Sequence, residues 1–132
     1  MSLYLPAFLK SLVPIGVFGL CGVFARYFMG LWIGKLIPSS FPFNTFIINI
    51  LGSFLIGFIF VFGMEKTHLS PALRLGMMVG FIGGFTTFSS YSLEAALLFE
   101  RGKFTVGLCY FILSPMVGLF FTFCGIALAR KF

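Results

Sequence analysis

The side chains best suited to binding a ligand lie together between Gly80 and Ser92, where the sequence is Gly-Phe-Ile-Gly-Gly-Phe-Thr-Thr-Phe-Ser-Ser-Tyr-Ser. Glycines are followed there by hydroxyl groups that alternate with aromatic rings, inside a segment that is otherwise hydrophobic. A hydroxyl donates and accepts hydrogen bonds. Nothing in the stretch is assembled for breaking covalent bonds, so it suits permeation or helix packing.

The same stretch is too polar to face lipid and too apolar to form a surface loop. In a bilayer, backbone N–H and C=O groups must be satisfied within the protein, so non-helical backbone survives only against protein or a water-filled cavity. We predict that the helix containing this stretch is broken near its middle, with Gly83 and Gly84 as the point of unwinding. Such a break marks a candidate functional site.

A second polar stripe precedes it in the chain. Thr45, Asn49, Gly52 and Ser53 recur at the spacing of one helical face. The amide of Asn49 can donate two hydrogen bonds and accept others. It suits holding an ion, pinning a neighbouring broken helix, or forming an ordinary bond between membrane helices. These interpretations stay open.

Single polar groups occur in the remaining hydrophobic segments. Tyr110 precedes Ser114 by four residues. Pro115 follows Ser114, and a membrane helix tolerates a proline if a neighbouring group bonds to the carbonyl that the missing N–H leaves free. Arg26 lies in mid-segment, where a charge costs about 2.5–3.5 kcal/mol on insertion scales, so we predict that it faces the bundle interior, a partner or a cavity. The alternative is that its side chain snorkels to the membrane interface. Glu94 is predicted to pair with a base or to lie near the membrane interface.

The elements that carry these residues are predicted to be membrane-spanning helices. Of 132 residues, 60% are hydrophobic and 9% charged, and the mean hydropathy is +1.13. A helix needs about 20 apolar residues to cross the bilayer. We predict an all-α integral membrane protein, a single four-helix domain over residues 1–132, with an interfacial lead-in at residues 1–12. The predicted spans cover residues 13–35, 43–63, 71–99 and 103–129.

The net charge of +6 comes from basic residues near the ends of the spans, where they suit lipid headgroups and not nucleic acid. With four spans, one side carries Lys10, Lys66, Arg74, Arg130 and Lys131, and the other carries Lys35, Arg101 and Lys103. Because this asymmetry is weak, the chain is permitted to insert both ways. A second copy in the opposite orientation would then be a natural partner.

The inventory of reactive groups excludes an enzyme. The chain has three acidic residues and one histidine, His68, which lies beside a predicted turn. It contains no metalloprotease, serine-hydrolase or phosphate-loop motif, and its three cysteines lack the spacing of a zinc site. Permeation and helix packing remain, and the hydroxyl and amide donors favour an anion over a cation.

Three blocks of sequence resemble the fluoride-specific channel family, called Fluc or CrcB. They are Gly-x-x-Gly-x-x-x-Arg-Tyr from Gly19, Asn-Thr-Phe-x-x-Asn-x-x-Gly-Ser-Phe-x-x-Gly from Asn44, and the stretch from Gly80 to Glu94. The resemblance covers all four spans. The third block usually reads Thr-Thr-Phe-Ser-Thr-Phe, whereas this chain has Ser90 and Tyr91 at its end. Gly118 stands where some members carry a further hydroxyl.

The resemblance implies a fluoride-selective channel that lowers cytoplasmic fluoride by passive efflux across the bacterial inner membrane. It further implies an antiparallel, dual-topology homodimer with a structural sodium ion at its interface, held by the backbone carbonyls of Gly83 and Thr86. Arg26 and Glu94 would be supporting or vestibule residues. The fluoride pore would be lined by Asn49, Phe88, Tyr91, Thr45, Ser90, Tyr110 and Ser114.

Two other functions are compatible with a small four-span protein. A proton-coupled multidrug transporter needs a titratable carboxylate in the membrane, and Glu94 is the candidate. A non-transporting assembly subunit would use its small-residue helix faces to bind a partner.

Overall fold

The computed structural model describes residues 6–132, and each regular element within them is a helix. Four helical stretches are long and apolar enough to cross a membrane: Phe8–Leu36, Phe43–Lys66, Pro71–Glu100 and Phe104–Ala129. The predicted all-α membrane fold with four spans is therefore confirmed. The first helix is continuous from Ala7, so the separate lead-in predicted for residues 1–12 is wrong from that residue on, and residues 1–5 lie outside the described part.

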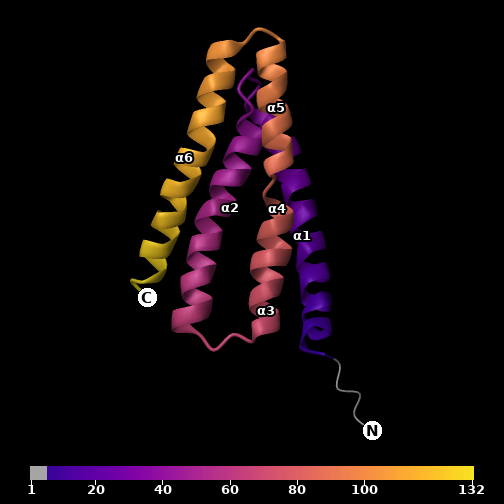
Figure 1. Ribbon diagram of the computed structural model, residues 1–132, viewed down its shortest axis with the longest axis vertical. Coiled ribbons are helices and arrows are strands. Elements are labelled where there is room, and N and C mark those ends of the chain that lie inside the picture. Colours follow the sequence, from indigo (N-terminus) through magenta and orange to yellow (C-terminus); the bar gives the residue numbers. More distant parts are fainter. Residues whose placement is uncertain (1–5) are drawn as a thin grey trace.

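The chain runs up and down through the bundle (Figure 1). The loops at residues 37–42 and 101–103 lie at one end, and the loop at residues 67–70 lies at the other, with the start of the first helix and the end of the last. The elements are α1 (Ala7–Leu36), α2 (Phe43–Val61), η1 (Phe62–Lys66), α3 (Pro71–Leu75), η2 (Gly76–Ile82), α4 (Gly83–Phe85), α5 (Phe88–Glu100) and α6 (Phe104–Ala129).

The third span is broken, as predicted, but at a different place. Gly83 keeps helical dihedral angles, whereas Thr86 and Thr87 are extended, with φ/ψ of −84°/160° and −150°/113°. The unwinding predicted at Gly83 and Gly84 is therefore wrong by a few residues. Both threonine hydroxyls bond locally, Thr86 to the Ile82 carbonyl at 2.9 Å and Thr87 to the start of α5. Such side-chain bonds compete with the helical backbone pattern.

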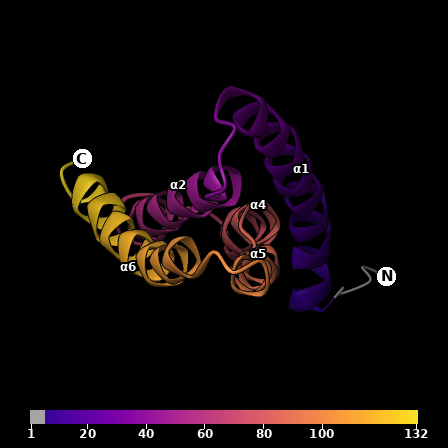
Figure 2. The same cartoon turned by 90° about the horizontal axis from the view of Figure 1, so that it is seen from above.

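Glycines bring helix backbones into direct contact in two pairs, α1 with the third span and α2 with α6. A Cβ atom on Gly80 would lie 2.6 Å from the Ile15 carbonyl oxygen, and one on Gly84 would lie 2.6 Å from that of Gly19. A Cβ atom on Gly125 would likewise meet the Phe54 carbonyl. Seen from above, the two pairs lie on opposite sides of the bundle (Figure 2). Close approach through small residues is how membrane helices associate.

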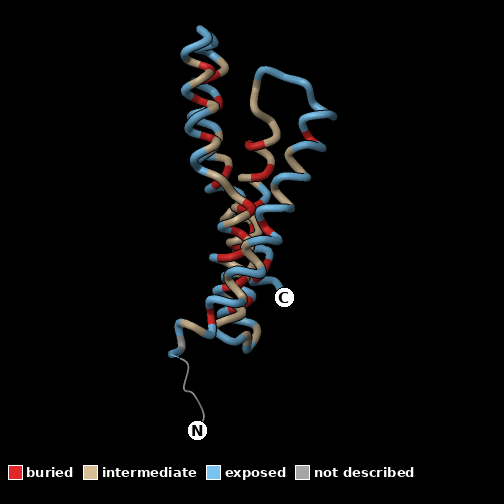
Figure 3. Tube along the Cα trace, turned by 90° about the vertical axis from the view of Figure 1, so that its right-hand side faces the viewer, coloured by how far each residue is buried: buried red, intermediate tan, exposed pale blue. Residues whose placement is uncertain are grey.

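Most residues of α1 and α6 are exposed, whereas most residues of α2 are half-buried or buried (Figure 3). One buried cluster joins Tyr91, Ala95 and Leu98 of α5 to Tyr110 of α6. The exposed surface is rich in phenylalanine and leucine, which suits contact with lipid. Among the polar residues of the third span, Thr86, Thr87, Ser90 and Glu94 are half-buried, and Ser89 and Ser92 are exposed.

Candidate functional site

Asn49 pins the break in the third span. Its Nδ2 donates to the Thr87 carbonyl at 3.0 Å, and the Thr87 N–H donates to its Oδ1 at 2.8 Å. One side chain thereby satisfies both backbone groups of an unwound residue, which the membrane environment requires. Of the three roles left open for Asn49, the structure shows the pinning of a broken helix. One amide N–H stays available for another acceptor.

Thr87 caps the helix that follows the break. Its Oγ1 accepts the Ser90 N–H at 3.2 Å and donates to the Ser90 Oγ at 3.0 Å. This is the usual way in which a threonine before a helix satisfies an orphan N–H group. The sequence interpretation did not include Thr87 in the site. The spacing of Thr87 and Ser90, typical of an N-cap, was the signal that could have identified it.

The N–H groups of Thr87 and Ser90 bond to side chains, so the carbonyls of Gly83 and Thr86 lack the donors that they would have in a continuous helix. In a continuous helix the Thr87 N–H would bond to the Gly83 carbonyl, and the Ser90 N–H would bond to that of Thr86. They donate to Asn49 and to the Thr87 hydroxyl instead. Within residues 6–132 no backbone N–H donates to either carbonyl. These are the two carbonyls for which the family resemblance implies a sodium ion.

Glu94 is held by two hydroxyl groups. The Thr45 Oγ1 donates to one carboxylate oxygen at 2.7 Å, and the Tyr110 hydroxyl donates to the other at 2.7 Å. Thr45 is 5% exposed and Tyr110 is fully buried. Of the two placements left open for Glu94, the pairing with a base is not seen, because Glu94 forms no ion pair among the described residues. The hydroxyl protons of Thr45 and Tyr110 are committed to this carboxylate.

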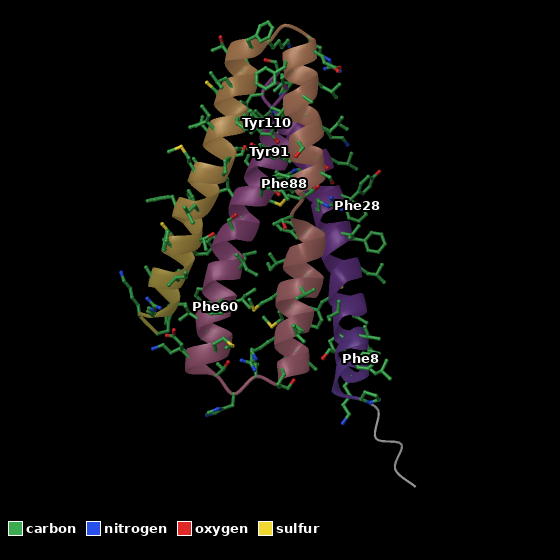
Figure 4. All side chains as sticks on the ribbon, viewed as in Figure 1. Phe8, Phe28, Phe60, Phe88, Tyr91 and Tyr110 are labelled. Atoms are coloured by element: carbon green, nitrogen blue, oxygen red, sulfur yellow. The ribbon has the colours of Figure 1, made fainter. Side chains whose placement is uncertain are left out.

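A small cavity brings together predicted pore residues from three helices. It has a volume of about 120 Å³ and is lined by Asn49 of α2, Phe88 and Tyr91 of α5, and Ser114 and Pro115 of α6. The ring centroids of Phe88 and Tyr91 are 5.6 Å apart. Figure 4 shows these rings near Tyr110 between α5 and α6, whereas Phe8 and Phe28 point outward from α1. The Ser114 hydroxyl is buried and has no hydrogen-bond partner within the described chain.

A larger cavity of about 380 Å³ lies on the α1 side of the break. The residues with polar side chains that line it are Arg26, Tyr27, Asn44, Thr45, Thr87, Ser90 and Glu94. Arg26 is half-buried and makes no ion pair or hydrogen bond with any other residue from 6 to 132. This agrees with the predicted position of Arg26 against a cavity. Thr87 lines this cavity and bonds to Asn49, which lines the smaller one.

The chain is similar to known proteins over most of its length. A family model described as "CrcB-like protein, Camphor Resistance (CrcB)" matches residues 13–126. A protein of Geotalea daltonii named fluoride-specific ion channel FluC is 41% identical over 122 residues, 92% of this chain and 98% of its own. A protein of the same name from Hahella chejuensis is 42% identical over 119 residues, 90% and 94% of the two chains. The matched region contains each residue that lines the two cavities.

Proposed function

This chain belongs to the CrcB family, and from that membership we propose that it is a fluoride-selective ion channel through which fluoride leaves the cell passively. The protein is a multi-pass membrane channel and not an enzyme. The observation that carries the proposal is the small cavity beside the break, where Asn49, Phe88, Tyr91 and Ser114 meet around an unbonded hydroxyl. Relatives about 40% identical over nearly the whole chain are named fluoride-specific channels.

The donors in this cavity suit a small, hard anion. The Ser114 O–H and the second N–H of Asn49 can donate to fluoride, and a positive ring edge of Phe88 can face it. Each contact replaces part of the water shell without forming a single deep well, as conduction requires. We propose Asn49, Phe88, Tyr91, Ser90 and Ser114 as the pore lining.

The other predicted site residues support this path. Because the Thr45 and Tyr110 hydroxyls donate to Glu94, the three form a fixed network beside the pore, and we propose for them a supporting role. Arg26 places a positive charge in the larger cavity. Glu94 lines the same cavity, but both of its carboxylate oxygens already accept hydroxyl donors. Arg26 has no such partner among the described residues, so its charge is available to attract an anion, and we propose this cavity as the vestibule.

We propose that the channel is an antiparallel homodimer. Phe88 is 78% exposed in a single chain although it lines the smaller cavity. Because no protein covers the outer side of the Phe88 ring in a single chain, a second protein surface is needed to complete the fluoride path. The weak charge asymmetry between the two ends supports insertion in both orientations, and the bacterial inner membrane is the proposed location.

We propose a structural sodium ion held by the backbone carbonyls of Gly83 and Thr86. Their helical donors are diverted to side chains, so both oxygens are free to act as ligands. The Gly83 position is exposed, with open space around it. Carbonyls at the ends of broken membrane helices are typical sodium ligands. The ion would supply a fixed positive charge at the interface.

Ion flux from liposomes tests the proposal. Liposomes that contain the purified protein should release trapped fluoride rapidly when a potassium ionophore lets potassium leave with it and no membrane potential builds up. Chloride release should stay at the level of liposomes without protein. Equal release of chloride would contradict the proposed selectivity. No observation favours the multidrug transporter, because Glu94, its candidate carboxylate, is held by two hydroxyls.

A further inference from the structure

Tyr91 makes a contact that the proposed function does not use. Its hydroxyl donates to the main-chain carbonyl of Phe111, on the neighbouring helix α6, at 2.7 Å. Tyr91 is only 8% exposed, and it stands where the family pattern has phenylalanine. Its phenol proton is therefore committed to a protein acceptor.

The carbonyl of Phe111 needs this donor because of Pro115. In a helix, the carbonyl of Phe111 would accept the N–H of the residue four positions later, which is Pro115 and has no N–H. An unsatisfied carbonyl is costly in the membrane. Tyr91 supplies the missing hydrogen bond from α5, which explains how α6 accommodates the proline.

Ser114 is the natural competitor for the same carbonyl. A serine hydroxyl within a helix commonly bonds to the carbonyl three or four residues before it, and Thr122 does this in α6, donating to the Gly118 carbonyl at 3.1 Å. Phe111 precedes Ser114 by three residues. Yet the Ser114 hydroxyl has no partner within residues 6–132, and Ser114 lines the small cavity beside Tyr91.

We infer that Tyr91 is a positioning residue that keeps Ser114 available to the transported ion. By donating to the Phe111 carbonyl, the phenol takes one of the two lone pairs of that oxygen and makes it a weaker acceptor for the Ser114 hydroxyl. The Tyr91 hydroxyl then acts on the ion through Ser114 and not by direct donation. This inference rests on the proposed function, because it takes the small cavity to lie on the fluoride path.

Fluoride flux through variants tests this role. Tyr91→Phe keeps the ring and removes the donor, so Ser114 should turn to the Phe111 carbonyl and flux should fall about fivefold, the factor that one hydrogen bond of average net strength represents. In a Ser114→Ala background the same change should alter flux by less than about twofold. A fall of equal size with and without Ser114 would overturn the inference.

A rescue experiment separates positioning from simple damage. Pro115→Ala restores the N–H that bonds to the Phe111 carbonyl, so Tyr91→Phe should lose most of its effect on flux when measured relative to Pro115→Ala alone. Ser92→Ala is a matched control, because it removes another hydroxyl-to-carbonyl bond of α5 at an exposed position and should leave flux unchanged. An undiminished effect of Tyr91→Phe in the Pro115→Ala background would also overturn the inference.

Thermal unfolding in detergent distinguishes failure of the inference from failure of the proposed function. Tyr91→Phe should lower Tm in the natural background, and it should lower Tm much less in the Pro115→Ala background, whatever the transported ion is. If the unaltered protein does not release fluoride, the proposed function fails, and the role of Ser114 toward the ion fails with it. Equal losses of Tm in both backgrounds would show that the phenol does not compensate for the proline.

Discussion

At the scale of single residues, the site depends on side chains that replace missing backbone hydrogen bonds. Asn49 bonds to both backbone groups of Thr87, and Tyr91 bonds to the carbonyl that Pro115 leaves free. Each replacement allows a helix to deviate within the membrane without leaving polar groups unsatisfied. The same deviations expose the carbonyls and hydroxyls that can meet an ion.

Replacing Asn49 by alanine should destabilise the fold strongly. The change leaves the N–H and C=O of Thr87 without partners, and each buried orphan group costs about 1–3 kcal/mol. Thermal unfolding in detergent should show a large fall in Tm. Asn44→Ala is the matched control, because Asn44 lines the larger cavity without a hydrogen bond to the described residues. Similar losses for both variants would contradict the pinning role of Asn49.

Replacing Glu94 by glutamine should weaken the network that it forms with Thr45 and Tyr110. Both hydroxyls donate to the carboxylate, and a glutamine amide presents an N–H to one of them in place of an acceptor. Hydrogen bonds to charged groups contribute about 1.5–3 kcal/mol each, so we expect a loss of stability of that order, measured by unfolding. Glu100→Gln, at an exposed position, should have little effect. An unchanged Tm for Glu94→Gln would contradict the network.

At the scale of elements, the third span works as two helices that share one axis. α4 ends in free carbonyls, and α5 begins with the Thr87 cap, so a negative helix end and a positive helix end meet at the break (Figure 1). The glycines before the break serve a different purpose, since they let α1 approach the backbone. Close packing with α1 therefore holds the first half of the span in place.

Adding a methyl group to Gly80 should separate α1 from the third span. The new Cβ atom would lie 2.6 Å from the Ile15 carbonyl oxygen, and backbone cannot move aside as a side chain can. Overpacking of this kind costs about 1–3 kcal/mol, which a fall in Tm of Gly80→Ala would reveal. Gly16→Ala, with nothing within 4 Å of its Cβ position, is the control in the same helix pair. It should be neutral or slightly stabilising, because alanine favours helix.

Sodium should stabilise the protein if the carbonyls of Gly83 and Thr86 bind it. A ligand that binds only the folded state raises Tm as its concentration increases. A titration with sodium chloride should raise Tm, and potassium chloride at equal ionic strength should raise it much less. Identical curves for the two salts would contradict the sodium site while leaving the fluoride path untouched.

At the scale of the whole molecule, a single chain looks incomplete as a channel. Phe88 lines the smaller cavity yet is largely exposed, and the Gly83 position faces open space. The ends of the bundle carry five and three basic residues, a difference too small to impose one orientation. These features support the proposed second copy inserted in the opposite sense.

Dual insertion can be measured directly. We expect a cysteine introduced at Lys131, in a variant without the natural cysteines, to react from the outside in about half of the molecules in intact cells. The cysteine-free parent, carrying no introduced thiol, gives the background. Labelling of all or none of the molecules would show a single orientation and contradict the antiparallel dimer. Light scattering of the detergent-solubilised protein should give about twice the 14.6 kDa of one chain.

The sequence by itself determined the membrane fold and the neighbourhood of the site. Hydrophobic runs of sufficient length allow only spanning helices, and polar groups inside such runs are costly enough to stand out. Asn49 and Ser114 stand out in this way, the family resemblance implied Phe88 and Tyr91 beside them, and the four residues line one cavity. The alternation of hydroxyls and rings after Gly80 indicated a break, because the stretch is too polar for a helix that faces lipid.

Only the tertiary structure decided which donors meet which acceptors. The break lies at Thr86 and Thr87, not at Gly83 and Gly84, because hydrogen bonds from Asn49 and local hydroxyls fix it there. Glu94 meets hydroxyls and no base, and Tyr91 meets a carbonyl of another helix. These partners lie 16 to 49 residues apart in the chain. Periodicity places a residue on a helix face, but the packing of helices selects its partner.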